Sequence, residues 1–271
     1  MRRSSGFDDI WPCVAEIVAD VRHRGDAAVA DWAERVGDPT PERVAVEPQV
    51  LEADVERALR SLIETVTAVH AAERPQDVTV EPRPGVVVER RWLPLDSVGI
   101  YVPAGRFPLP SSLVMAAAPA RVAGVGRICV VSPRPVPATL AVASLLGIEE
   151  IHAIGGAQAI AALAFGTDSI RPVDKIVGPG NRWVTAAKLL VSAHVGVDLP
   201  AGPSEVLVIA DETADPALCL VDLRAQAEHG PDSEAVLVTT SAELAAAVGW
   251  PRVELVESLD EAIAYANDYA P

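Results

Sequence analysis

From Arg127 onward, β-type segments alternate with helical segments, and this alternation limits the possible folds more than any other feature of the sequence. The expected strand and helix pairs are 127–132 with 138–146, 150–154 with 157–165, and 174–177 with 182–193. Strands that are separated by helices of this length pair in parallel through right-handed crossovers. The sequence therefore predicts an open α/β sheet in this region.

The same alternation continues after Pro200. The expected elements are strands at 205–209, 235–239 and 253–256, and helices at 216–229, 242–248 and 259–269. No GxGxxG fingerprint follows any of the expected strands, which argues against an ordinary Rossmann domain. We therefore expect two α/β domains with open, mostly parallel sheets, flanking helices and an incomplete Rossmann-like character.

The first hundred residues have a different pattern. Apolar residues recur at helical spacing over 8–36, where Gly25 interrupts them, and over 48–73. β-rich segments at 78–80 and 86–91 flank a Pro-Arg-Pro-Gly turn, which favours a hairpin. The proline-rich stretch 101–110 is expected to be a loop. The N-terminal region thus predicts helices and a hairpin that precede the α/β alternation.

Composition excludes several classes of partner. The 22 basic and 38 acidic residues give a net charge of −16, which repels nucleic acid and anionic lipid surfaces. The structural alternative is that the acidity only keeps the protein soluble. No apolar stretch approaches the roughly 18 residues of a membrane span, and no signal peptide is evident at the start. Cys13, Cys129 and Cys219 show no metal or disulfide spacing and are expected to be buried apolar residues. We expect a cytoplasmic protein.

Two glycine-rich loops follow expected strands and precede expected helices. They are GGAQ at 155–158 and GPGN at 178–181. Ligands of open α/β sheets bind at such places, where helix N-termini favour anions, and the Gln158 and Asn181 amides could contact ribose or phosphate oxygens. The structural alternative is that the glycines form tight turns and that Asn181 is a helix N-cap.

Gln226 and His229 lie three residues apart near the end of an expected helix. This spacing places both side chains on one side of the helix, where they could be two ligands of one metal ion. The structural alternative is a histidine that interacts favourably with the helix dipole, with Gly230 as the helix cap.

In order, five segments resemble the successive motifs of the histidinol dehydrogenase family. They are VGIYVPAG at 98–105, GGAQA at 155–159, VGPGN at 177–181, PAGPSE at 200–205 and QAEHGPDS at 226–233. The resemblance extends from about Asp20 to Thr240. The remaining histidines match no motif and are expected to be surface or structural residues: His23, His70, His152 and His194.

This resemblance implies a role for each matching residue. Tyr101, Gln158 and Asn181 would contact NAD, and Ser204, Gln226 and His229 would bind an amino-alcohol substrate. Gln226 and His229 would also hold Zn²⁺, which anchors the substrate during two successive hydride transfers. The family fold implies an inserted α/β NAD-binding-like domain at 101–203 within a discontinuous domain made of 1–100 and 204–271.

The family's catalytic residues are not found in this sequence. The segment 267–271 resembles the lead-in to a consecutive Glu-His pair, so that pair is expected to follow Pro271. The Asp and His that complete the zinc shell, and the C-terminal segment that subunits of the family's homodimer exchange, are also expected beyond it. We therefore expect no catalytic residue, a weakened zinc site, and a monomer or weak dimer for this chain alone.

Two functional hypotheses follow from these observations. The first is an NAD-dependent histidinol dehydrogenase that oxidises L-histidinol to L-histidine, as a fragment of a longer protein or with a second chain that supplies the missing region. The second is a non-catalytic binding module or pseudoenzyme that keeps only the NAD-binding and ligand-binding half.

Overall fold

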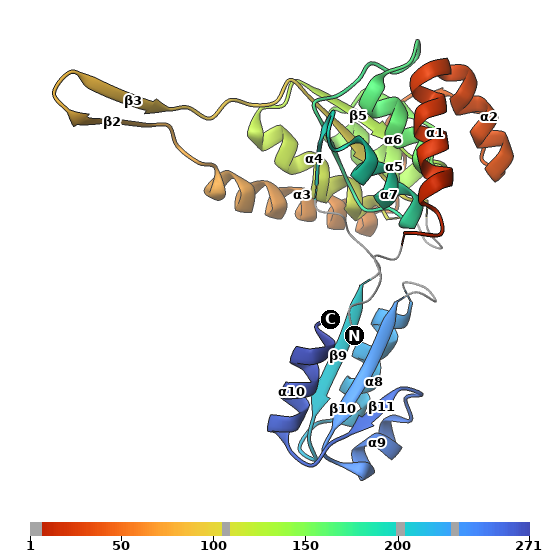
Figure 1. Cartoon of the computed structure of the whole chain (residues 1–271), viewed down its shortest axis with the longest axis vertical. Coiled ribbons are helices and arrows are strands. Elements are labelled where there is room, and N and C mark those ends of the chain that lie inside the picture. The colour runs from red at the N-terminus through yellow and green to blue at the C-terminus, as the bar shows by residue number, and fades with distance from the viewer. Residues whose placement is uncertain (1–6, 105–108, 199–203, 229–232) are drawn as a thin grey trace. The chain divides into compact units, whose positions relative to one another are not determined.

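The computed structural model describes residues 7–104, 109–198, 204–228 and 233–271. The chain divides into two compact units, Met1–Pro200 and Ala201–Pro271, and each contains its own parallel sheet (Figure 1). The predicted fold class, α/β with open and mostly parallel sheets and flanking helices, is confirmed. Among the described residues, no helix combines the length and apolar character that a membrane crossing requires.

The first unit is built on a six-stranded sheet in the order β1-β6-β5-β4-β7-β8. All neighbouring strands are parallel except β1 and β6, which are antiparallel. The strands are β1 (Arg43–Val44), β4 (Ser97–Tyr101), β5 (Arg127–Val131), β6 (Glu150–His152), β7 (Lys175–Val177) and β8 (Gly196–Val197). The separate hairpin of β2 (Val78–Arg83) and β3 (Val86–Arg90) extends away from the sheet (Figure 1).

Helices cover both faces of this sheet. On one side, α6 (Gly156–Phe165) and α7 (Arg182–Val191) share a core with α1 (Trp11–Arg24), which contacts both of them, and α2 (Asp26–Val36), which contacts α6. On the other side, α4 (Pro110–Ala123) and α5 (Pro137–Leu145) share a core with α3 (Ala53–Glu73), which contacts α4. On the central strand β4, Ile100 belongs to the core under α3, α4 and α5, and Tyr101 to the core under the other four helices, because successive side chains of a strand point to opposite faces.

The second unit is a smaller α/β layer. Its sheet has the order β11-β10-β9 and is parallel throughout. Its elements are β9 (Glu205–Ala210), α8 (Pro216–Ala227), β10 (Glu234–Thr239), α9 (Ala242–Val248), β11 (Val253–Leu255) and α10 (Leu259–Tyr269). Side-chain oxygens of Asp215, Ser241 and Ser258 accept hydrogen bonds from backbone N–H groups in the first turns of the three helices, which explains where each helix begins.

The structure differs from several expectations. The segment 101–110 is not entirely a loop, because Tyr101 ends β4 and Pro110 begins α4. The helix expected from residue 48 begins only at Ala53, since Glu52 keeps an extended backbone. Cys129 and Cys219 are buried as expected, but Cys13 is only half-buried. The boundary between the two compact units falls after Pro200, and β4 pairs with β5 and β7; neither observation tests the predicted discontinuous domain. The association of 1–100 with 204–271 stays a prediction.

Candidate functional site

The chain reverses its direction of travel across the first sheet beside β4. It passes from β4 to β5 and β6, and then returns to place β7 on the other side of β4. The helices that follow β4 and β7 cover opposite faces, so the connections after these two strands diverge. A crevice at the carboxyl ends of the strands is expected at such a switch point, and it is the usual ligand site of open α/β sheets.

A cavity of about 510 Å³ lies at this place. Residues that follow β4, β5, β6 and β7 or end these strands line it, together with residues of α1 and α2 and with Asp38, which lies just after α2. Its lining is Cys13, Ile17, Trp32, Val36, Asp38, Tyr101, Pro103, Ala104, Pro133, Gly156, Ala157, Gln158, Asn181 and Trp183. The three residues that the family resemblance assigned to NAD, Tyr101, Gln158 and Asn181, therefore lie around one cavity. Its volume is in the range of small-molecule sites.

Tyr101, at the end of β4, is hydrogen-bonded to the segment that follows β6. Its hydroxyl oxygen accepts a hydrogen bond from the backbone N–H of Gly156 at 3.3 Å, at the first turn of α6. Burial raises the pKa of the phenol, the Gly156 hydrogen bond opposes this, and the negative charge of Asp38 adds to the rise. Tyr101 is therefore a neutral phenol at physiological pH, able to donate its proton to a ligand oxygen.

Gln158 has an unused hydrogen-bond donor. Its side chain is 2 % exposed, and within the described chain its Nε2 has no hydrogen-bond partner. The amide folds back over Gly156, where a Cβ atom would lie 2.5 Å from Gln158 Oε1, and Gly156 has a φ of +65°. A buried donor without a partner is costly, so a polar ligand in the adjacent cavity would stabilise it.

Asn181 is a helix N-cap, which is the structural alternative given for it in the sequence analysis. Its Oδ1 accepts from the N–H groups of Trp183 and Val184, both at 3.1 Å, so Asn181 is the N-cap of α7. The cap uses only the amide oxygen. Because the residue is exposed and borders the cavity, its Nδ2 group can still donate to a ligand.

The loop that carries Asn181 is held by an ion pair between buried Lys188 and half-buried Asp198. Lys188, which is 4 % exposed, contacts Asp198 with an Nζ–Oδ1 distance of 2.6 Å. Lys188 also donates to the carbonyl of Gly178, and Asp198 Oδ2 accepts from the Gly178 N–H at 2.7 Å. Both polar groups of Gly178 are thus occupied, which fixes the start of the loop.

Gly178, the residue after β7, also lies close to the backbone of Tyr101 at the end of β4. Its φ is +111°, and a Cβ atom on it would lie 2.2 Å from the carbonyl oxygen of Tyr101. Only glycine fits this contact. The close approach brings the β7 loop and Tyr101 to the same rim of the cavity.

The second unit brings together two of the three residues that were predicted to bind substrate. Gln226, on the last turn of α8 and 6 % exposed, donates from Nε2 to the carbonyl and to the hydroxyl of Ser204, the latter at 3.0 Å. The third residue, His229, lies outside the described residues. The Gln226 side-chain oxygen also lies 3.4 Å from the Ser204 hydroxyl oxygen, so the two side chains form one connected polar group.

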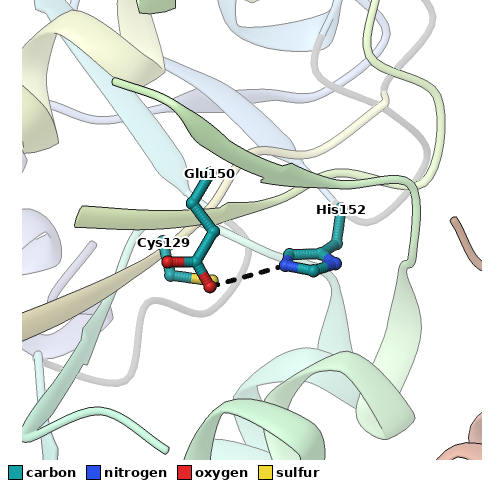
Figure 2. A group of neighbouring side chains, drawn as sticks. All are labelled: Cys129, Glu150 and His152. Atoms are coloured by element: carbon teal, nitrogen blue, oxygen red, sulfur yellow. Dashed lines mark ion pairs between the residues drawn. The ribbon is translucent and has the colours of Figure 1, made fainter. Parts of the chain in front are cut away.

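A separate group of Cys129, Glu150 and His152 has the donor types of a metal site (Figure 2). Their potential ligand atoms lie within 4.8 Å of one another. However, both carboxylate oxygens of Glu150 accept hydrogen bonds from Arg127, at 2.8 Å each. Burial raises the pKa of the Cys129 thiol, so the thiol stays protonated. We interpret the group as a buried ion pair with two neutral neighbours.

The ionisation of this group follows from its contacts. Burial would raise the pKa of Glu150, but hydrogen bonds and the charge of Arg127, with smaller contributions from Cys129 and His152, outweigh burial and hold it at about 2. Burial lowers the pKa of His152, against the attraction of Glu150, whose Oε1 is 3.5 Å from Nε2. His152 is thus a buried neutral histidine, which agrees with a structural role.

Sequence reasoning missed the wall of the cavity that α1 and α2 provide. The sequence pattern predicts only helices for Ile17, Trp32 and Val36 and a buried apolar residue for Cys13, and it does not single out Asp38. No local signal marks them, because their place beside α6 depends on packing across more than a hundred residues. Trp183 lies next to the GPGN motif and could have been included on that ground.

The open parallel sheet, with helices on both faces and a pocket at its switch point, places the chain among the doubly wound α/β proteins. A family model, histidinol dehydrogenase, matches residues 1–269. The chain belongs to the histidinol dehydrogenase family.

Individual relatives agree with this assignment. The chain is 48% identical over 256 residues to a histidinol dehydrogenase of Gluconobacter oxydans (strain 621H), and 45% identical over 244 residues to one of Vibrio parahaemolyticus. These alignments cover 90% and 86% of the chain. The crystal structure of histidinol dehydrogenase from Elizabethkingia anophelis is 32% identical, with a TM-score of 0.76 over 100% of this chain and 70% of that one. The chain spans only 60% and 57% of the length of the first two relatives.

Proposed function

We propose that this chain provides the dinucleotide pocket, and part of the substrate site, of an NAD-dependent enzyme that oxidises L-histidinol to L-histidine. The observation that carries the proposal is the cavity at the switch point. Tyr101, Gln158 and Asn181 come from three different strand ends, and all of them line it.

NAD suits the donors that this cavity offers. The unpartnered Nε2 of buried Gln158, the Nδ2 of Asn181 and the Tyr101 hydroxyl can each donate to ribose or phosphate oxygens. The exposed ring of Trp183 and the half-buried wall of α1 and α2 provide apolar surface for a base. When bound, NAD would accept the hydride from the alcohol. The residues of this chain orient the coenzyme and exclude water from one side of it.

We assign Ser204, Gln226 and His229 to the substrate, and Gln226 and His229 also to Zn²⁺. Ser204 holds the Gln226 amide by two hydrogen bonds, which orients its oxygen as a possible ligand atom. One oxygen fits a zinc shell but does not complete one, since zinc generally takes four ligands. The ion would supply a positively charged anchor for the amino alcohol. The Glu-His pair, the further zinc ligands and the discontinuous domain of 1–100 and 204–271 belong to the same proposal.

The remaining parts of the proposal concern the partners and the location of the protein. The substrate is a small amino alcohol, and the active assembly is a homodimer or a complex with a second chain that carries the expected C-terminal region. The net charge of −16 argues against nucleic acid as a partner. A biosynthetic enzyme of this kind is expected in the cytoplasm.

The test has a binding part and a turnover part. Calorimetric titration of the whole chain with NAD should give binding that Gln158→Ala weakens roughly tenfold. Gln76→Ala, which alters an exposed glutamine outside the cavity, should leave it unchanged. L-histidinol, Zn²⁺ and NAD should then give NADH only when a polypeptide with the expected Glu-His region is added. Absence of NAD binding, or absence of NADH in every such mixture, would contradict the proposal.

A further inference from the structure

Asp38 contributes a carboxylate to the cavity, and its backbone is held firmly. The α2 helix ends at Gly37, which has a φ of +72°. The N–H of Asp38 donates to the Ala33 carbonyl at 2.9 Å, which gives the hydrogen-bond pattern of a Schellman motif. Asp38 is therefore placed by the end of a helix and not by a free loop.

The Asp38 carboxylate lies against the first turn of α6. A Cβ atom on Gly155, the N-cap residue of that helix, would be 3.2 Å from Asp38 Oδ2. No hydrogen bond from any described residue reaches this carboxylate. Burial raises its pKa, while the charge of Arg134 acts in the opposite direction. The carboxylate is half-exposed to the cavity, so it keeps its charge at neutral pH and has two oxygens that can accept hydrogen bonds.

Gln158 supplies the complementary donor on the same turn of α6. Its unpartnered Nε2 and the Asp38 carboxylate both lie beside the Gly155-Gly156 turn and line the same cavity. A ribose hydroxyl can donate its proton to a carboxylate and accept a hydrogen bond from an amide N–H at once. A 2′-phosphate has no such proton at neutral pH, and its charge of nearly −2 would be repelled by the carboxylate.

We infer that Asp38, together with Gln158, recognises a free ribose diol and makes the pocket select NAD over NADP. This inference rests on the proposed function, because it names the coenzyme class of the same pocket.

The experiment compares NAD and NADP on the whole chain by calorimetric titration. Wild-type protein should bind NAD at least about tenfold more tightly than NADP, because like charges in one pocket are strongly unfavourable. Asp38→Asn should weaken NAD binding several-fold and reduce the preference for NAD over NADP by roughly tenfold. Glu34→Gln is the matched control: it removes one negative charge from the exposed face of α2 and should change neither affinity.

The outcomes separate this inference from the proposed function. If NAD binds and Asp38→Asn keeps the full preference for NAD, Asp38 is not the selecting residue, while the NAD pocket stands. If Glu34→Gln reduces the preference as much as Asp38→Asn does, net charge and not a contact decides it, which also overturns the inference. If wild-type protein binds neither dinucleotide, the inference and the proposed function both fail.

Discussion

Lys188 and Asp198 both bond to the backbone of Gly178, Lys188 at its carbonyl and Asp198 at its N–H. The two charged groups contact each other at 2.6 Å. α7 and the end of β8 are thereby connected to the end of β7. The contact fixes the loop that brings Asn181 to the cavity.

Removal of the Asp198 charge should destabilise the first unit. Asp198→Asn leaves the Lys188 ammonium buried without a counter-charge, which should lower the free energy of unfolding by about 2–3 kcal/mol. The measurement is urea denaturation, read as a shift in midpoint at constant slope. Asp54→Asn, which breaks an exposed ion pair with Arg57, should cost less than about 1 kcal/mol. Equal losses of unfolding free energy in the two variants would show that the Lys188–Asp198 pair contributes no more than an exposed ion pair.

A side chain at Gly178 should not be tolerated. Gly178→Ala would place a methyl group 2.2 Å from the Tyr101 carbonyl oxygen at a positive φ, so the loss of stability should be about 3 kcal/mol or more. Gly85→Ala tests the backbone strain alone, because Gly85 has a φ of +78° with nothing within 4 Å, and it should cost about 1 kcal/mol. The two losses of stability are measured by thermal unfolding of both variants. A Gly178→Ala protein as stable as Gly85→Ala would contradict the close contact.

Two substitutions at Asn181 can separate helix capping from ligand binding. Asn181→Ala removes the cap of α7 and should cost about 1 kcal/mol of stability. Asn181→Asp keeps an oxygen that can cap the helix but removes the Nδ2 donor, so stability should be retained while NAD affinity falls about tenfold. Thermal unfolding and NAD titration of each variant measure the two effects. If Asn181→Asp binds NAD as wild type does, Asn181 is only a helix cap.

His152 should make stability depend on pH. Its folded-state pKa is lowered by burial, so as pH falls through the ordinary value of 6.5 the unfolded chain takes up a proton that the folded chain does not. Stability contributed by the neutral form is therefore lost below about pH 6.5, by up to about 1.4 kcal/mol per pH unit until the folded-state pKa is reached.

The check is urea denaturation at pH 7 and pH 5.5. His152→Gln should reduce the loss of stability between these two values, whereas His23→Gln, at an exposed histidine of α1, should leave it as in wild type. A wild-type loss that persists unchanged in His152→Gln would mean that other groups titrate in this range.

Much of the secondary structure was predictable because it depends on neighbouring residues. Gly25 separates α1 from α2, and serine, aspartate or asparagine side chains begin α7 to α10. The expectation failed for β4 and α4, which were assigned to a proline-rich loop at their boundaries. The prolines of 101–110 predict irregular structure, but a proline such as Pro110 also suits the first turn of a helix, where its missing N–H is not needed.

By itself, the sequence determined the α/β alternation, the capped starts of α7 to α10 and the ordered motifs, because each of these is set by residues within one or two turns of chain. Only the tertiary structure decided that Tyr101, Gln158 and Asn181 line one cavity, and that α1, α2 and Asp38 close its side. The strand order β6-β5-β4-β7 brings these residues next to one another. That order depends on helices distant in sequence, which bury the two apolar faces of the sheet. Such long-range packing leaves no periodic mark near Asp38, so its place beside the Gly155 turn could be found only from the folded chain.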